Sequence, residues 1–413
     1  MNRTKEPKKF DAIVCLSAID WDFLWQRTQE IMSQFAAMGY PVLFIENTGV
    51  RIPGIKDGPR VWNRLKKVFS PVKGRSIESN ANIEILSPFA LPLPYMQTAV
   101  TINAALLRSK ILLFSKLRNI PVNRILLWSY MTTPLAVELA GNLPWAGVVV
   151  DLVSDPCKVP GAEAIVTSHK RMLERANIVL CASVPTMNTA KHYMSESGHY
   201  KLHLFEDGFS TRLQDIIQCG EYEYQLPWED NGRPLVAYIG GINDKIWWDA
   251  VSAMASRFPE INFTFIGPKE YNELPCEGFG KNVIWLPPFK EYSQLGYFLK
   301  KCKAGLIPYT PTPYVMEMRP AKINEYLVMG LPIVATKMPE LERLSKETGP
   351  GIVYLADTAD RFVTILGQAF DEDSVDLRSR RREIAKNRAW ETICMGLKDR
   401  LQGLIREEHY TRE

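Results

Sequence analysis

The chain has 413 residues, too many for one ordinary hydrophobic core and enough for two domains of about 200 residues each. With 46% hydrophobic residues, 23% charged residues and a net charge of +4, the composition is that of a globular protein without a strong basic excess, so we expect no nucleic-acid partner. Seven scattered cysteines without a CxxC pair, no apolar leader and no uncharged apolar run of about 18 residues predict a cytoplasmic protein with reduced thiols.

The first half of the chain alternates short apolar runs with longer amphipathic stretches, which is the pattern of parallel strands joined by crossover helices. Several runs are almost entirely apolar, as expected for strands buried on both faces. The predicted strands are residues 11–16, 41–45, 83–86, 125–128, 147–151, 178–181 and 202–205. The predicted helices include residues 25–38, 95–117, 162–176 and 185–194.

Residues 51–118 of this half carry twelve Lys or Arg residues and three acidic residues. Such a basic stretch, interleaved with aromatic and aliphatic side chains, suits contact with an anionic membrane surface. A solvated face beside ordinary core residues is an equally good interpretation.

The alternation restarts in the second half, with predicted strands at residues 235–239, 262–266, 283–285, 304–307, 332–335 and 351–354. Between them, residues 210–234 accumulate Glu, Asp, Asn, Gly and Pro, which places a domain boundary there. We therefore predict an α/β protein with one doubly wound parallel-sheet domain over residues 1–212 and a second over residues 213–385. Ligands of such domains bind at the carboxyl ends of the strands.

The strand at 235–239 is followed by Gly240 and Gly241 and then by Lys245. Glycines let the backbone approach a ligand, and free amides at the start of a helix favour a phosphate. We predict a helix from residue 243 or 244 to about residue 257, with Lys245 in its first turn as a cation for a diphosphate. The alternative is a tight turn followed by a helix cap and an exposed lysine.

A second segment, residues 317–336, combines Glu317, Arg319, Lys322 and Glu325 with a predicted helix that begins at Pro320. Lys322 and Glu325 are three residues apart and share a helix face. A helix start that carries Arg319 and Lys322 suits an anion, and a carboxylate in the following turns suits the hydroxyls of a ribose. The alternative is a surface ion pair worth about 0.3 kcal/mol.

With seven residues between them, Glu317 and Glu325 resemble the E-x7-E motif of retaining family-4 glycosyltransferases, which have the GT-B fold of two Rossmann-like domains facing across a cleft. Residues 321–336 are similar to that family's K-x-x-E-Y-x-x-x-G-x-P-V-V-A-T segment. The resemblance implies that Glu325 binds the ribose, Glu317 contacts the donor sugar and Lys245 binds the diphosphate. Where the family often has an arginine after the strand's glycine, this chain has Gly241, and Arg319 is the candidate replacement.

The resemblance also implies where the base of the nucleotide binds. Gly267, after the strand at 262–266, and Pro288, after the strand at 283–285, match the positions that hold the base in these proteins, mainly through the backbone. Backbone contacts leave the identity of the base open, and we favour a UDP-sugar as the donor, with no cofactor.

Residues 20–29 resemble the W-x-x-x-W-Q-R-x-Q start of a bacterial subset of these transferases, often found in surface-polysaccharide pathways. We place Trp21, Trp25 and Arg27 on the acceptor side; for the two tryptophans, packing in the core is the alternative. Asp151 and Asp155 lie at the end of an apolar strand, where acids of this fold face the ligand. Asp155 would orient the acceptor hydroxyl or the donor sugar, or else cap the next helix.

The five histidines have no HxH or HExxH spacing, so we expect no metal site. Catalysis would then be electrostatic, with Lys245, Arg319 and Lys322 stabilising the leaving diphosphate, Glu317 on the sugar and Asp155 on the acceptor side.

The sequence thus predicts a glycosyltransferase of bacterial polysaccharide synthesis that moves a sugar, with retention, to a glycan or lipid-linked acceptor. Residues 1–212 would bind the acceptor, residues 213–385 the nucleotide sugar, and residues 386–413 would form a helix that crosses back to the first domain. Peripheral contact with the inner face of the plasma membrane is part of this hypothesis. Two alternatives are a non-catalytic GT-B protein that binds nucleotide sugars as a partner or scaffold, and a nucleotide-sugar epimerase or hydrolase, for which no acid–base histidine is evident.

Overall fold

The structure is a computed structural model that describes residues 9–48, 82–88, 90–91, 93–158, 163–218, 232–269, 280–289 and 292–410. Residues 51–81 of the basic stretch and residues 219–231 of the expected domain boundary lie outside the described residues.

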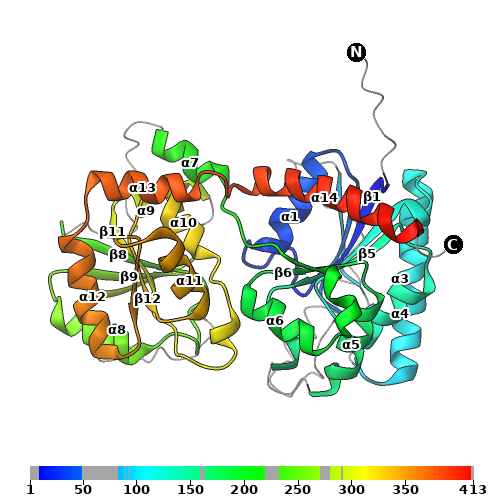
Figure 1. Cartoon of the computed structure of the whole chain (residues 1–413), viewed down its shortest axis with the longest axis horizontal. Coiled ribbons are helices and arrows are strands. Elements are labelled where there is room, and N and C mark those ends of the chain that lie inside the picture. The colour runs from blue at the N-terminus through cyan, green and yellow to red at the C-terminus, as the bar shows by residue number, and fades with distance from the viewer. Residues whose placement is uncertain are drawn as a thin grey trace, which may run out of the picture. The chain divides into compact units, whose positions relative to one another are not determined.

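The chain divides into two compact units. Unit 1 comprises residues 1–206 together with 394–413, and unit 2 comprises residues 207–393. The sequence predicted these domain boundaries at residues 212/213 and 385/386, a few residues from the observed boundaries at 206/207 and 393/394. The C-terminal helix α14 (Trp390–Tyr410), red in Figure 1, carries the chain back to unit 1.

Unit 1 contains a parallel sheet of seven strands in the order β3-β2-β1-β4-β5-β6-β7. The strands are β1 (Ala12–Leu16), β2 (Val42–Ile45), β3 (Ile83–Leu86), β4 (Ile125–Ser129), β5 (Gly147–Leu152), β6 (Ile178–Cys181) and β7 (Leu202–Leu204). Because β1 pairs with both β2 and β4, the strand order reverses at β1. This reversal places the topological switch point of unit 1 between β1 and β4.

The helices of unit 1 begin at recognisable capping residues. Thr133 accepts the Ala136 amide at the start of α4 and Ser183 accepts the Thr186 amide at the start of α6, each with a proline in the first turn. The helices, which surround the sheet in Figure 1, are α1 (Arg27–Ala37), α3 (Gln97–Arg118), α4 (Pro134–Asn142), α5 (Val166–Arg175) and α6 (Val184–His192), and the 3₁₀ helix η3 spans Pro156–Lys158.

Unit 2 contains a parallel sheet of six strands in the order β10-β9-β8-β11-β12-β13. The strands are β8 (Leu235–Ile239), β9 (Asn262–Ile266), β10 (Val283–Leu286), β11 (Cys302–Ile307), β12 (Ile333–Thr336) and β13 (Val353–Ala356). The helices are α7 (Thr211–Gln218), α8 (Trp248–Arg257), α9 (Tyr292–Lys300), α10 (Lys322–Val328), α11 (Pro339–Thr348), α12 (Ala359–Asp371) and α13 (Val375–Ala385), and the 3₁₀ helix η6 spans Val315–Glu317. All thirteen predicted strands are present, and the doubly wound fold is confirmed.

Two predicted helix starts in unit 2 are wrong. Helix α8 begins at Trp248, not near residue 243, because Ile242 and Ile246 are buried and form bridges with Lys269 and Tyr309. Lys245 consequently lies in the loop before the helix rather than in its first turn. Helix α10 begins at Lys322, two residues after Pro320.

The side chain of Tyr326, in α10, joins the two central strands of unit 2. Its hydroxyl accepts the Ile239 amide at 3.2 Å and lies 3.0 Å from the Ala237 carbonyl and 3.2 Å from that of Leu306. A Cβ on Gly305 would lie 2.3 Å from the Tyr326 ring, so glycine is required for the ring to cross β11. The buried hydroxyl thus takes the place of strand pairing at the carboxyl ends of β8 and β11.

Helix α3 is the one helix among the described residues that is long and apolar enough to cross a membrane by length and composition. Its inner face, which includes Leu107, Ile111 and Phe114, is buried in unit 1. A helix packed against the core of a globular unit meets the same criteria, so this finding is weak evidence for a membrane span.

Candidate functional site

The carboxyl ends of β8 and β11 form the switch point of the six-stranded sheet, where proteins of this architecture bind ligands. Gly240 and Gly267 follow β8 and β9 and have φ values of +125° and +154°. A Cβ on Gly267 would lie 1.9 Å from the Gly240 carbonyl oxygen, so the two loops approach each other as closely as glycine permits. Gly240 therefore lies at the switch point, and Gly267 lies directly against it.

Lys322 brings a buried ammonium group to this loop. Its Nζ lies 3.4 Å from the position of a Cβ on Gly240 and donates a hydrogen bond of 2.5 Å to the Tyr309 hydroxyl. The same Nζ lies 4.1 Å from the centre of the Tyr238 ring and 4.7 Å from that of Tyr309. Burial raises the pKa of Tyr309, but the Lys322 ammonium and the hydrogen bonds from Lys322 and Tyr238 outweigh it, so the net shift of this pKa is downward.

Lys245 adds a second cation near Tyr309. The Lys245 carbonyl accepts the Thr310 amide at 2.7 Å, and the Lys245 ammonium lies 5.4 Å from the centre of the Tyr314 ring. Among the described residues, no carboxylate forms an ion pair with the ammonium of Lys245 or that of Lys322. The site therefore carries two ammonium groups that no carboxylate contacts directly, beside the Gly240 loop, which suits an anion.

Glu325 lies on α10, one turn after Lys322, and is partly exposed. The Tyr292 hydroxyl donates a hydrogen bond to its Oε1. Desolvation raises the pKa of Glu325, although the Tyr292 hydrogen bond and the Lys322 charge lower it, and the net shift is upward. A carboxylate held by one hydroxyl retains a free oxygen lone pair for the hydroxyl of a ligand.

Glu317 and Arg319 are both buried in the segment that leads to α10. The Arg319 guanidinium lies 3.6 Å from Glu340 Oε2, at the start of α11. Glu340 also accepts a hydrogen bond of 2.8 Å from Arg343. Glu340 therefore lies beside two guanidinium groups, those of Arg319 and Arg343.

Two other predicted residues of this site contribute differently. The Gly241 carbonyl accepts the Tyr238 hydroxyl at 2.8 Å, which fixes the loop after β8. Pro288 is exposed in the loop after β10. The indole of Trp285, in β10, donates to the Gly267 carbonyl at 3.0 Å and thereby joins this strand to the Gly267 turn.

In unit 1, the predicted acceptor-side residues Arg27 and Asp151 form a buried ion pair. Arg27 Nη2 lies 2.9 Å from Asp151 Oδ1, and Arg27 Nε lies 3.0 Å from the same oxygen. Asp151 also accepts the Trp128 indole N–H at 3.3 Å, and the Arg27 guanidinium lies 4.9 Å from the centre of the Phe205 ring. Arg27 is buried, and its charge is stable in the interior because Asp151 lies beside it.

The two predicted tryptophans have different environments. Trp21 is 6% exposed and packs edge-on against Phe44, with ring centres 4.8 Å apart. Trp25 is 45% exposed and packs edge-on against Trp21 at 5.4 Å. Trp21 is therefore a core residue, and Trp25 presents an aromatic surface to solvent.

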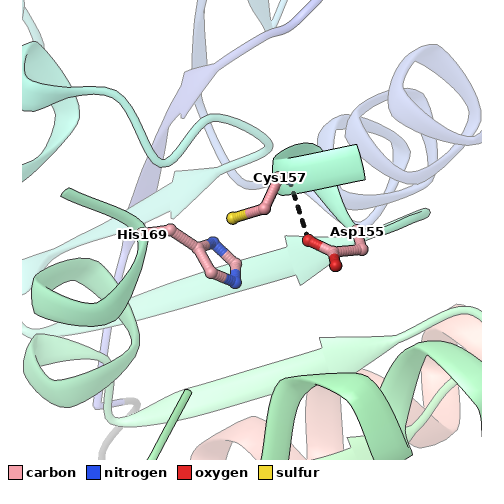
Figure 2. Close-up of side chains that lie close together, drawn as sticks. All are labelled: Asp155, Cys157 and His169. Carbon is pink, nitrogen blue, oxygen red and sulfur yellow. Dashed lines mark hydrogen bonds between the residues drawn. The ribbon is translucent and has the colours of Figure 1, made fainter. Parts of the chain in front are cut away.

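Asp155 is buried after β5, where its Oδ1 accepts the Cys157 amide at 2.9 Å and its Oδ2 accepts the Tyr193 hydroxyl at 3.2 Å. It thus caps η3. Figure 2 shows the side chains of Asp155, Cys157 and His169 converging on one space. Burial lowers the pKa of His169 to about 4 and raises that of Cys157 to about 11.

Sequence reasoning missed the tyrosines of the first site and the Asp155, Cys157 and His169 cluster. Tyr309 follows β11 at the same edge as Gly240, so the strand-end argument could have included it. Cys157 and His169 come from η3 and α5, and only folding brings them together.

No protein-family model matches the chain. In sequence it is 25% identical over 249 residues to TuaH of Bacillus subtilis, named as a teichuronic acid biosynthesis glycosyltransferase; the match covers 56% of this chain and 58% of that protein. The structure is similar to sucrose-phosphate synthase of Thermosynechococcus elongatus (TM-score 0.68, 14% identity, 95% of this chain and 99% of that chain).

It is also similar to Alr3699/HepE of Anabaena, solved in complex with UDP-glucose (TM-score 0.60, 14% identity, 95% of this chain and 99% of that chain). These structural matches have low sequence identity and cover both sheets, so they define the fold. The chain therefore has the GT-B fold of these glycosyltransferases and is related in sequence to a glycosyltransferase named for teichuronic acid biosynthesis.

Proposed function

We propose that this protein is a glycosyltransferase that moves a sugar from a UDP-sugar to a glycan or lipid-linked acceptor in polysaccharide synthesis. The observation that carries the proposal is the pair of cations, Lys322 and Lys245, beside the glycine loop at the switch point of unit 2. The UDP-glucose complex of HepE and the name of TuaH support this donor and this pathway class.

The reaction that fits this site is governed by charge. As the bond between sugar and diphosphate breaks, negative charge collects on the diphosphate, where the ammonium groups of Lys322 and Lys245 stabilise it without the reorganisation that water would need. Tyr309 holds Lys322 in place through its hydroxyl. Glu325 would accept the ribose hydroxyls, and Glu317 would contact the sugar, with retention at the anomeric carbon.

On the acceptor side, Trp25 offers its exposed indole face to a sugar ring. Arg27 and Asp151, which neutralise each other below the surface, act as positioning residues for the start of α1 and the end of β5. Asp155 belongs to the same edge of the seven-stranded sheet.

The test is release of UDP from UDP-sugars, measured with and without total lipid or glycan acceptors. Removing one electrostatic donor commonly lowers turnover about 10²–10³-fold, so we expect Lys245→Ala to lower it about a hundredfold with the fold intact by circular dichroism. Lys346→Ala, an exposed lysine of α11, is the matched control and should leave turnover unchanged. Near-normal turnover of Lys245→Ala would remove this residue from the mechanism.

A second candidate function is favoured by the position of Arg319. Gly241 stands where the family that the chain resembles often has an arginine, and Glu340 lies beside the charge of Arg319, the candidate replacement, so the site could bind a nucleotide sugar without transferring it. Calorimetric titration with UDP, together with the turnover assay, distinguishes a glycosyltransferase from a protein that only binds the nucleotide sugar. Binding that Glu325→Gln weakens, together with no turnover of any UDP-sugar, would establish the non-catalytic function.

Contact with an anionic membrane is part of the proposal, and the outer face of α3 supports it. This face exposes Ile102, Leu106, Leu113 and Leu117, the last to 69%, and the helix carries Arg108, Lys110, Lys116 and Arg118 without an acidic residue. Each such cation near an anionic surface contributes about 1 kcal/mol.

We expect the protein to sediment with phosphatidylglycerol vesicles at low salt, and Leu113→Glu with Leu117→Glu to abolish this. Val375→Glu, which changes an exposed apolar residue of unit 2, is the control and should bind like the native protein. Vesicle binding that survives the double change would exclude the α3 face.

A further inference from the structure

Three side chains of different chemistry meet at the carboxyl end of β5 in unit 1. Asp155 lies just before η3, Cys157 lies in η3, and His169 lies in α5 (Figure 2). One donor atom from each lies within 4.8 Å of the donor atoms of the other two. Tetrahedral zinc with bonds of about 2.0–2.3 Å needs ligand atoms about 3.3–3.8 Å apart, so closure by about 1 Å would complete the geometry.

A hydrogen-bond contact on one side of the His169 ring leaves the nitrogen on the other side for a metal ion. Its Nδ1 lies 3.1 Å from the Thr132 hydroxyl, which follows β4, and the ring is 1% exposed. Among residues that the structure describes, the Nε2 of this buried imidazole has no hydrogen-bond partner. Fixing one imidazole nitrogen by a hydrogen bond so that the other binds metal is the usual arrangement in metal sites.

The other two donors are also held in place. The Asp155 carboxylate is fixed by the Cys157 amide and the Tyr193 hydroxyl, and the Tyr193 ring packs edge-on against His169 at 4.8 Å. Cys157 is a partly exposed thiol that forms no disulfide and lies beside the Asp155 carboxylate and the Tyr193 hydroxyl. A thiolate, an imidazole and a carboxylate form a donor set that suits zinc and does not suit magnesium or calcium.

We propose that Asp155, Cys157 and His169 bind one Zn²⁺ ion in unit 1. Binding replaces the thiol proton of Cys157, which is released to solvent, with a sulfur–zinc bond. Three protein ligands leave a coordination position for water or for a hydroxyl of another molecule. The ion would join η3 to α5 and so fix the loop after β5. This proposal concerns unit 1 alone and holds whether or not unit 2 transfers a sugar.

The test uses the full chain, stripped of metal by a chelator under reducing conditions and titrated with Co²⁺, which reports sulfur ligation by a near-ultraviolet charge-transfer band. We expect one equivalent of Co²⁺ to produce the band and Zn²⁺ to displace it. Cys157→Ser should abolish the band, and because this side chain is partly exposed, the variant should fold. Cys302→Ala, a buried cysteine of unit 2, is the matched control and should keep the band.

A second variant tests the arrangement rather than the ligands. Thr132→Val removes the hydroxyl behind His169 and should weaken Zn²⁺ binding about 10–100-fold while the sulfur band remains at saturating Co²⁺. Absence of the band in the native protein, a band that survives Cys157→Ser, or a Zn²⁺ dissociation constant above about 1 μM would each overturn the proposal.

Discussion

At the scale of single residues, pairing with an opposite charge decides which charged residues of the predicted site remain available to a ligand. Arg27 was predicted for the acceptor side from the family resemblance of residues 20–29, and Asp151 from its place at the end of β5. The structure buries both and pairs them at 2.9 Å, so each compensates the charge of the other in the interior. A sequence shows residue types and order, but it does not show that two charges 124 positions apart compensate each other.

This pair yields a prediction about stability. Arg27→Met should lower the free energy of unfolding by about 3–5 kcal/mol, because it leaves the Asp151 carboxylate charged in the interior. The partly exposed pair of Arg124 and Asp11 is the matched control, and Arg124→Met should cost less than about 1 kcal/mol. Urea unfolding followed by circular dichroism measures both values. Equal losses for the two variants would show that Asp151 stays hydrated despite its burial.

The site in unit 2 shows the same limit of sequence reasoning. Gly240, Lys322 and Glu325 were predicted because they occur in short motifs, and the structure places Gly240, Glu325 and Tyr309 around Lys322. Tyr309 belongs to no motif, and its role depends on the Lys322 ammonium reaching its hydroxyl. Arg319 was expected to supply a charge to the site, but Glu340, which comes from a later helix, lies beside it.

At the scale of elements, the strands were predictable because they are buried on both faces and read as apolar runs. The start of α8 was not, because residues 242–246 contact the loops after β9 and β11 before the helix begins. Such pairing between loops leaves no periodic signal in the sequence. The consequence for function is that the backbone of the loop, and not a helix turn, presents Lys245.

The buried hydroxyl of Tyr326, which joins β8 to β11, should contribute to the stability of unit 2. Tyr326→Phe leaves the Ile239 amide without its buried acceptor, so we expect a loss of about 1–3 kcal/mol in the free energy of unfolding. Tyr354→Phe is the control, since the hydroxyl of Tyr354 bonds to the exposed Glu372, whose carboxylate solvent can reach. Chemical denaturation of both variants measures the difference. A Tyr326→Phe protein as stable as the control would mean that water fills the space between the strands.

At the scale of the whole molecule, each unit has its own buried core. The core of unit 2 extends from Phe209 to Ala389, and that of unit 1 is formed by residues between Ala12 and Leu202. Helix α14 is the element that returns to unit 1, where the Gln402 side chain accepts the Lys9 amide at 2.7 Å and Leu401 is fully buried. The two-part organisation followed from the repeated strand pattern, whereas the helix's return was implied only by the family resemblance.

Separate cores predict two thermal transitions in differential scanning calorimetry. Leu401→Ala should lower the transition temperature of unit 1 alone, and Leu344→Ala, buried in α11, that of unit 2 alone. In each case the cavity left behind should reduce the free energy of unfolding of that unit by about 2–5 kcal/mol. UDP at a hundredfold excess over its dissociation constant should raise the free energy of unfolding of unit 2 alone, by about 2.7 kcal/mol, and so raise only its transition temperature. This stabilisation should disappear in Glu325→Gln. If both leucine variants moved one common transition, the units would unfold cooperatively. If UDP raised the unit 1 transition instead, the nucleotide would bind away from Gly240 and Lys322, and the proposed donor site would be wrong.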